Sequence, residues 1–243
     1  MRRYIIIGAL LFLSFAVAFA PSGLVDRLVD RVDGVELLGT SGTLWQGRGD
    51  LYVTQHNAGQ LSWDFNPSAL LQMQAGYNWE LRSLNGTLNG YGGASPTHFD
   101  VDLQGAVGLA FFEPWLERYN LTIEGDLTAH PSSITIDHGA GLIVALEGQL
   151  DWSGGEISYG LAGVTRYAGL PPLTAFLQKN GAGQPEAVVY ARGSDTPLLI
   201  ATPGMPGFIK IGMTKKFSSL LGRPWPGRAA DHEVVLEVEE QIF

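Results

Sequence analysis

The sequence predicts a mainly β protein: an N-terminal transmembrane helix, then one large, twisted antiparallel β-sheet domain, an open meander or half-barrel, with a few short helices. Three observations support this fold class. Glycine accounts for 32 of the 243 residues, roughly twice its usual share, and aromatic residues make up 10%. Short apolar runs with period two recur along most of the chain, separated by Gly or Asn. The first 20 residues, by contrast, are almost wholly apolar.

Residues 1–20 form the predicted transmembrane anchor. Two arginines precede an uncharged run at 4–20, which reaches roughly 25 Å as a helix, slightly less than the hydrocarbon core of a bilayer. A cleaved signal peptide is the alternative, because Ala18-Phe19-Ala20 resembles a cleavage site, but Pro21 would follow the cut and obstruct it. The arginines hold the N-terminus inside the cell. We therefore expect a single-pass protein of the bacterial cell inner membrane, with the rest of the chain in the periplasm.

Residues 21–34 are predicted to form an amphipathic helix and linker. Leu24, Leu28 and Val32 recur at helical spacing, charged residues occupy the opposite face, and Gly34 ends the pattern. Such a helix lies on its own domain or contacts a partner or the membrane surface. We therefore take Leu24, Leu28 and Val32 as candidate partner-binding residues.

Residues 35–243 are predicted to form one periplasmic β-rich domain, because no long Pro- or Ser-rich linker divides them. Short helices are expected near 66–73, where Asn66-Pro67 is a cap signal, and near 111–119, 173–178 and 214–221. The predicted strands are 35–38, 43–46, 50–55, 60–65, 79–83, 86–89, 98–103, 123–128, 133–137, 142–152, 156–161, 187–191, 198–201, 208–213 and 233–241.

The composition and motifs argue against most kinds of chemistry. The chain has no Cys, which excludes disulfides, thiolate metal sites and a Cys nucleophile, and its five His show no metal-ligand spacing. No nucleophile elbow, phosphate loop or dinucleotide loop is present. Asp100/Asp102 and Glu237/Glu239 each share a strand face, and such pairs are usually solvated. We predict no enzyme activity and no catalytic, cofactor-binding or metal-binding residue. The net charge is −9 and no basic cluster is larger than Lys215-Lys216, which argues against a nucleic-acid partner.

Aromatic residues and a weak repeat are the more informative features. Gly-x-Leu recurs, and two copies extend to a tryptophan, at Gly59–Trp63 and at Gly148–Trp152. The six tryptophans are expected mainly to pack a core. A sheet with one apolar face left open could instead hold a lipid chain or a protein strand.

One segment resembles a known family. Residues 34–48 read GVELLGTSGTLWQGR and resemble the opening motif of type II secretion system protein N, which has a basic N-terminus, one membrane helix and then a β-rich periplasmic domain. Residues 59–63, 66–71 and 217–228 resemble later segments of that family. No matching motif is found at 94–119, and the acidic tail 233–243 is not a family signature.

The resemblance implies a single-pass inner-membrane component of the machine that exports folded proteins across the outer membrane. Its partners would be other type II secretion system subunits and the inner membrane, and it would supply no catalytic residue. Thr43 and Trp45, inside the matching motif, join Leu24, Leu28 and Val32 as candidate partner-binding residues. The alternative function is a membrane-tethered lipid-binding or lipid-transfer protein with an apolar β-groove.

Overall fold

The structure is a computed structural model of the chain, and it describes residues 15, 18–29, 34–117, 120–161 and 163–241. The predicted anchor, residues 1–20, lies largely outside these ranges. Within them, no helix is both long enough and apolar enough to cross a bilayer.

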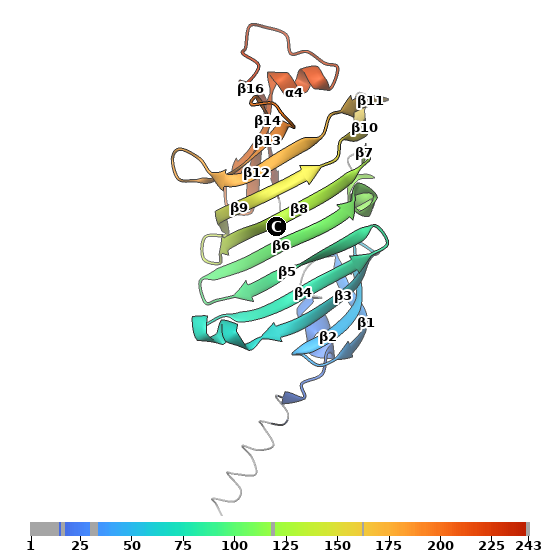
Figure 1. The fold of residues 1–243 in the computed structure, drawn as a ribbon, viewed down its shortest axis with the longest axis vertical. Coiled ribbons are helices and arrows are strands. Elements are labelled where there is room, and N and C mark those ends of the chain that lie inside the picture. Colours follow the sequence, from blue (N-terminus) through green and yellow to red (C-terminus); the bar gives the residue numbers. More distant parts are fainter. Residues whose placement is uncertain (1–14, 16–17, 30–33, 118–119, 162, 242–243) are drawn as a thin grey trace, which may run out of the picture.

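Thirteen strands of the described chain form one antiparallel sheet that does not close, because its first and last strands do not pair with each other (Figure 1). In chain order these strands are β1 (Val35–Gly42), β2 (Gln46–Val53), β3 (His56–Asn66), β4 (Ala75–Ser83), β5 (Gly86–Ala94), β6 (His98–Gly108), β8 (Asp126–Asp137), β9 (Leu142–Trp152), β12 (Leu173–Lys179), β13 (Pro185–Ala191), β14 (Pro197–Pro203), β15 (Phe208–Thr214) and β16 (Val234–Gln241). They pair in this order across the sheet. The prediction of a large, open, antiparallel meander is confirmed.

A second, three-stranded sheet forms from two insertions. β7 (Leu121–Ile123) lies between β6 and β8, while β10 (Gly155–Leu161) and β11 (Val164–Leu170) lie between β9 and β12. β10 pairs with β7 on one side and with β11 on the other, and its pairing with β7 places Ile157 opposite Ile123. The main buried cluster joins the two sheets, and its buried members are Trp152, Ile157, Ala168, Leu170, Leu198 and Phe217. The hydrophobic core therefore sits at one end of the large sheet.

The helices are short, and their ends follow the expected local chemistry. The 3₁₀ helix η1 (Pro67–Gln72) begins after Asn66, whose side chain accepts a hydrogen bond from the Ser68 amide at 3.1 Å. α4 (Lys215–Leu220) begins after Thr214, which caps the Phe217 amide. The other helical segments are α2 (Gly23–Val29), η2 (Leu109–Phe112) and α3 (Glu113–Leu116).

Two local predictions are wrong, and one strand is missing from the prediction. The helix expected at 173–178 is strand β12, because Leu173, Ala175 and Leu177 meet β9 on one sheet face. The strand expected at 43–46 is mostly the turn that joins β1 to β2. β11 was not expected at all, since its segment lacks a clear alternation.

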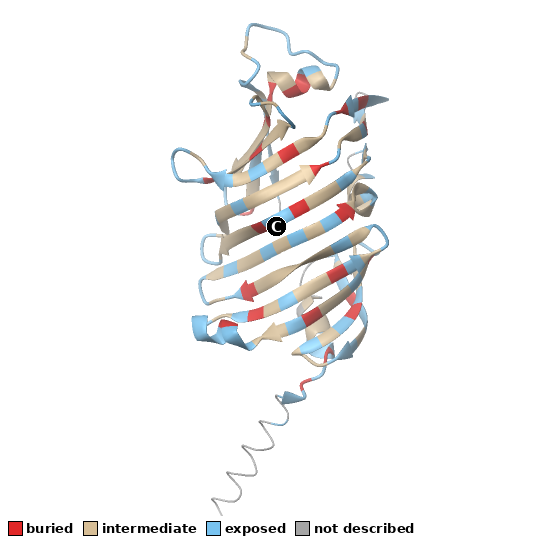
Figure 2. Cartoon of the chain, in the orientation of Figure 1, coloured by how far each residue is buried: buried red, intermediate tan, exposed pale blue. Residues whose placement is uncertain are grey.

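The centre of the large sheet is a single layer. In the described chain, β5 and β6 pack extensively only against their neighbours in the sheet. Figure 2 shows exposed and more buried residues alternating along β6, whereas β5 is mostly of intermediate burial. Register places apolar rows such as Leu61–Leu81–Leu88 and Val101–Ile134–Leu146 on one face. Polar rows occupy the other face, so the two open faces differ sharply in chemistry.

Candidate functional site

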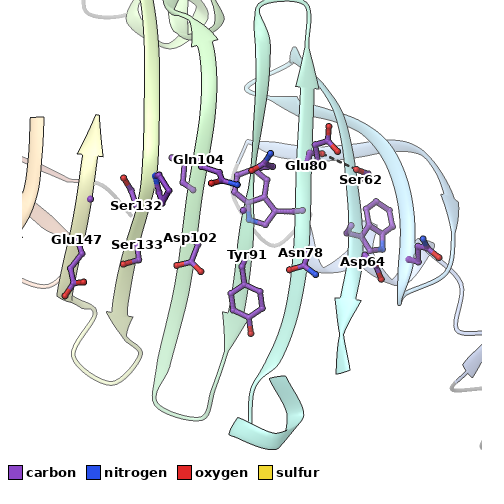
Figure 3. Close-up of a pocket in the computed structure, with 18 of the residues that line it drawn as sticks. Ser62, Asp64, Asn78, Glu80, Tyr91, Asp102, Gln104, Ser132, Ser133 and Glu147 are labelled. Atoms are coloured by element: carbon purple, nitrogen blue, oxygen red, sulfur yellow. Dashed lines mark hydrogen bonds between the residues drawn. The ribbon is translucent and has the colours of Figure 1, made fainter. Parts of the chain in front are cut away.

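The polar face of the central strands contains a trough of about 1000 Å³. It crosses seven strands, β2, β3, β4, β5, β6, β8 and β9, and Figure 3 shows the side chains that line it. Because side chains alternate along a strand, the trough runs between two rows of polar side chains over the backbone of the residues between them. The polar residues that line it are Gln46, Ser62, Asp64, Asn78, Glu80, Asn89, Tyr91, Asp102, Gln104, Ser132, Ser133 and Glu147.

Strand register builds both rows. One row runs Asp64, Asn78, Tyr91, Asp102, Ser133, Glu147, each residue directly opposite the next on the neighbouring strand. The second row runs Ser62, Glu80, Asn89, Gln104 in the same way. Residues directly opposite one another in antiparallel strands share a face. The trough is therefore a property of the paired sheet rather than of any one segment.

The trough is acidic. Glu80 forms an ion pair with Arg82, which lies outside the lining, at 2.5 Å. Asp64, Asp102 and Glu147 have no hydrogen bond or ion pair to any side chain of the described residues. The lining contains no Lys, Arg or His. Three carboxylates thus face solvent in the trough without a compensating cation.

Tyr91 is held in place near the middle of the first row. Its hydroxyl donates to Gln74 Oε1 at 3.2 Å, and Gln74 Nε2 donates to Asp100 Oδ2 at 2.9 Å. Thr135 Oγ1 donates to the other oxygen of Asp100 at 2.7 Å. Burial, followed by the charges of Asp100 and Asp102, raises the pKa of Tyr91 above its ordinary value, so the hydroxyl remains a donor.

The aromatic ring of Tyr91 lies close over the backbone of Gly76 and Gly93. A Cβ at Gly93 would lie 2.8 Å from the ring, and one at Gly76 would collide with the hydroxyl. These two glycines, directly opposite each other on β4 and β5, leave the space that the ring occupies.

A second polar cluster on the same face surrounds Asp151. Its carboxylate accepts hydrogen bonds from Thr174 Oγ1 at 2.6 Å and from Gln149 Nε2 at 3.1 Å, and His130 Nε2 lies 2.8 Å away. The Thr174 bond is the main cause that lowers the pKa of Asp151, with burial opposing it and His130 and Gln149 adding to it. In the described chain, no group of three or more acidic or His side chains is arranged to hold a metal ion.

Thr43 and Trp45, two of the predicted contact residues, lie in the turn between β1 and β2. Thr43 Oγ1 accepts hydrogen bonds from the amides of Trp45 and Gln46, both at 3.2 Å, and its carbonyl accepts one from Trp63 Nε1 at 3.2 Å. The ring of Trp45 contacts Phe65 edge-on, with centroids 4.9 Å apart. The opening motif is therefore a tightly bonded β-hairpin connection.

This hairpin also binds the chain that precedes the domain. The Leu44 amide donates to the Ala20 carbonyl at 2.7 Å, and Pro21 forms an isolated β-bridge with Thr43. Leu24 lies on α2 and is 38% exposed. Leu28 is also on α2, but its side chain is not among the described ones, and Val32 lies outside the described residues. The structure thus brings Thr43 and the start of α2 together at the end of the sheet where the chain enters.

The trough was not predicted from the sequence. The sequence places Asp100 and Asp102 together on one strand face but gives no link from this pair to Asp64 or Glu147. The available signal was the polar alternation along each strand, such as Ser62/Asp64 and Asn78/Glu80. Placing these pairs beside one another requires the register of six strands, which a single sequence does not supply.

Comparison with known proteins supports the resemblance of the opening motif. The family model described as type II secretion system (T2SS), protein N matches residues 33–200, which is more than half of the chain. No curated protein and no solved structure gave a match. The matched range starts just before β1 and includes the hairpin and every strand that lines the trough. The chain belongs to the type II secretion system protein N family.

Proposed function

We propose that the protein is an inner-membrane-anchored, periplasmic component of the type II secretion system, which acts by protein–protein contacts in the export of folded proteins. The observation that carries this proposal is the family match over residues 33–200. Residues 1–20 would be the anchor, 21–34 the amphipathic helix and linker, and 35–243 the periplasmic domain. The partners would be other type II secretion subunits.

An open single-layer sheet is suited to contacts of this kind. Among the strands of the described chain, β1 and β16 each pair with one neighbour, so alternate backbone groups of these end strands are directed away from the sheet. Leu24, Leu28 and Val32 would contact a subunit or the membrane surface close to the anchor. Thr43 and Trp45 would support that surface by fixing the hairpin against which the entering chain lies.

Deletion of the gene tests this proposal in the source organism. The expected result is that a folded protein normally found in the medium accumulates in the periplasm, and that the full-length chain restores its export. A chain without residues 1–20, delivered to the periplasm by an unrelated cleavable signal, should restore less export. Unchanged secretion and unchanged assembly intermediates in the deletion strain under every growth condition would reject the secretion role.

A second candidate function, lipid binding, is supported by the apolar face behind the trough. Leu61, Leu88, Val101 and Leu146 on this face are only partly buried, whereas Leu81, between Leu61 and Leu88, is buried. An acyl chain laid along this face would cover apolar surface that the protein itself leaves open. Mass spectrometry of the purified protein would then detect bound phospholipid, and Val101→Glu would abolish it while Asp102→Asn would not. Equal lipid content in both variants would argue against this function.

A further inference from the structure

We propose that the acidic trough is a docking site for an extended, arginine-bearing segment of a partner protein. The inference rests on the proposed function, since it names the chemistry of one partner of a protein that works by contacts. It concerns the trough lined by Asp64, Asp102 and Glu147, whose β2 end, at Gln46 and Gly47, adjoins the hairpin.

Charge is the first argument. Asp64, Asp102 and Glu147 share one row, have no cationic partner in the described chain, and line a trough without any basic side chain. Two arginines lie beside the trough on this face: Arg82 already binds Glu80, and Arg48, opposite Ser62 on β2, forms no ion pair with a lining carboxylate in the described chain. Complementary charge steers association and disfavours the wrong partners, so a basic segment fits this surface and an acidic one does not.

The spacing of the three carboxylates favours a polypeptide over a metal ion as the ligand of the trough. Asp64 and Asp102 are three strands apart and Asp102 and Glu147 two strands apart, which correspond to about 14 Å and 10 Å at the usual strand separation. Carboxylates so far apart cannot share one cation, and they repel one another only weakly at physiological ionic strength. An extended chain laid across the strands at about 3.3 Å per residue would bring residues i, i+4 and i+7 near the three carboxylates in turn.

Tyr91 favours arginine over lysine. It lies between Asp64 and Asp102 in the row, two strands from the first and one from the second. Its ring rests over Gly76 and Gly93, and its hydroxyl is held by Gln74. A guanidinium stacks on such a ring and binds a carboxylate through two parallel hydrogen bonds, whereas an ammonium does neither as well.

The remaining lining suits a peptide backbone. Asn78, Asn89 and Gln104 each offer an amide donor and acceptor, and Ser133 offers a hydroxyl between Asp102 and Glu147. A neutral glycan strand could also use these amides and hydroxyls, but it would leave the three carboxylates unneutralised. The charge pattern therefore favours the basic polypeptide.

Peptide binding to the full-length chain in nonionic detergent tests the proposal. The probe is a fluorescent eight-residue peptide with Arg at positions 1, 5 and 8 and Ser or Thr elsewhere, followed by fluorescence anisotropy at physiological salt. Replacing each Arg by citrulline, its neutral isostere, should weaken binding at least about tenfold, because charge-assisted hydrogen bonds are lost. Replacing Arg by Lys should weaken it several-fold, and Tyr91→Leu should remove that difference.

A matched pair of variants locates the site. The first is the triple variant Asp64→Asn/Asp102→Asn/Glu147→Gln, which should lower the affinity for the Arg peptide by about tenfold or more. Glu233→Gln/Glu237→Gln/Glu239→Gln removes the same charge from the exposed end of the sheet and should change the affinity less than about twofold. Thermal unfolding monitored by circular dichroism checks that both variants remain folded.

Three results would overturn the proposal: no saturable binding of the Arg peptide, equal weakening by both triple variants, or a neutral oligosaccharide that binds in its place and is unaffected by the trough variant. Equal weakening would indicate attraction by net charge alone. None of these results would alter the export phenotype of the deletion strain, so the docking site and the secretion role can fail separately.

Discussion

Single residues in the opening motif show why its sequence is so specific. Gly42 has φ of +106°, and a Cβ there would collide with the Gln46 carbonyl and lie 2.8 Å from Gly47 Cα. Thr43 completes the connection by accepting the two amide hydrogen bonds from Trp45 and Gln46. Gly and Thr are therefore required by the turn itself, which also holds the chain that enters the domain.

Gly42→Ala should destabilise the folded protein by roughly 2–3 kcal/mol, because it combines a disfavoured φ with a collision against backbone. Chemical denaturation monitored by tryptophan fluorescence measures this change. Gly181→Ala is the control, since its glycine has no atom near the added Cβ and no positive φ. A loss no larger than that of the control would mean that the hairpin can relax around the methyl group.

Asp151 makes a prediction about pH. The pKa of Asp151 is lower in the folded than in the unfolded chain, mainly because its carboxylate accepts the Thr174 hydrogen bond. Burial, the next largest influence, acts in the opposite direction and only partly cancels this lowering. The folded state therefore binds this proton less readily, and the stabilisation is complete above the unfolded pKa near 4 and lost as the pH falls through the folded pKa.

Thr174→Val should lower the free energy of unfolding at pH 7 by about 1–3 kcal/mol and make it less dependent on pH below about 4. Melting temperatures between pH 7 and pH 3 provide the measurement. Thr202→Val makes the same chemical change on β14, where the threonine has no side-chain hydrogen bond in the described residues. Parallel pH profiles for Thr174→Val and the unmodified protein would contradict the assignment.

At the scale of elements, tertiary pairing overrides local preference. The segment 173–178 has apolar residues at helical spacing, yet it forms β12 because the gap between β9 and β13 requires a strand there. The two insertions behave similarly: β7 has only three residues and depends on β10 for its pairing. Together they cover the core at one end of the large sheet.

Leu198→Ala should therefore be among the most damaging core substitutions, with a loss of roughly 3 kcal/mol from the cavity it leaves. Leu198 is 1% exposed and belongs to the cluster that joins the two sheets. Urea denaturation gives the value, and Leu84→Ala, at a fully exposed turn, should be nearly neutral. A small effect at Leu198 would show that the two sheets are joined mainly by other contacts.

The whole molecule is an open sheet with different chemistry on its two faces and a chain entry point at one end. The hairpin binds Ala20 and Pro21 directly, so the sheet contacts the chain at the point where the predicted anchor ends. This arrangement would hold the sheet close to the membrane surface. The acidic trough begins at β2, beside the hairpin, and continues across the middle of the sheet (Figure 3).

The N-terminal prediction can be tested on the protein isolated from membranes. Its intact mass should include residues 1–20, because Pro21 obstructs cleavage by signal peptidase, and alkaline carbonate should not extract it. Substituting Pro21→Ala should allow at least partial cleavage. An unmodified protein that begins at Pro21 or later would show that the segment is a signal peptide.

The sequence by itself determined the mainly β, open antiparallel architecture, most strand positions, the cap of η1 and membership in the family, because turns and caps depend on residues close together in the chain. It could not determine the order of 13 strands, the pairing of the two insertions, or the strand identity of 173–178. The acidic trough is the feature that the sequence alone could least reveal, because it exists only in the tertiary structure. Its three free carboxylates are 83 positions apart from first to last (Asp64 to Glu147), and only the register of six paired strands places them in one row.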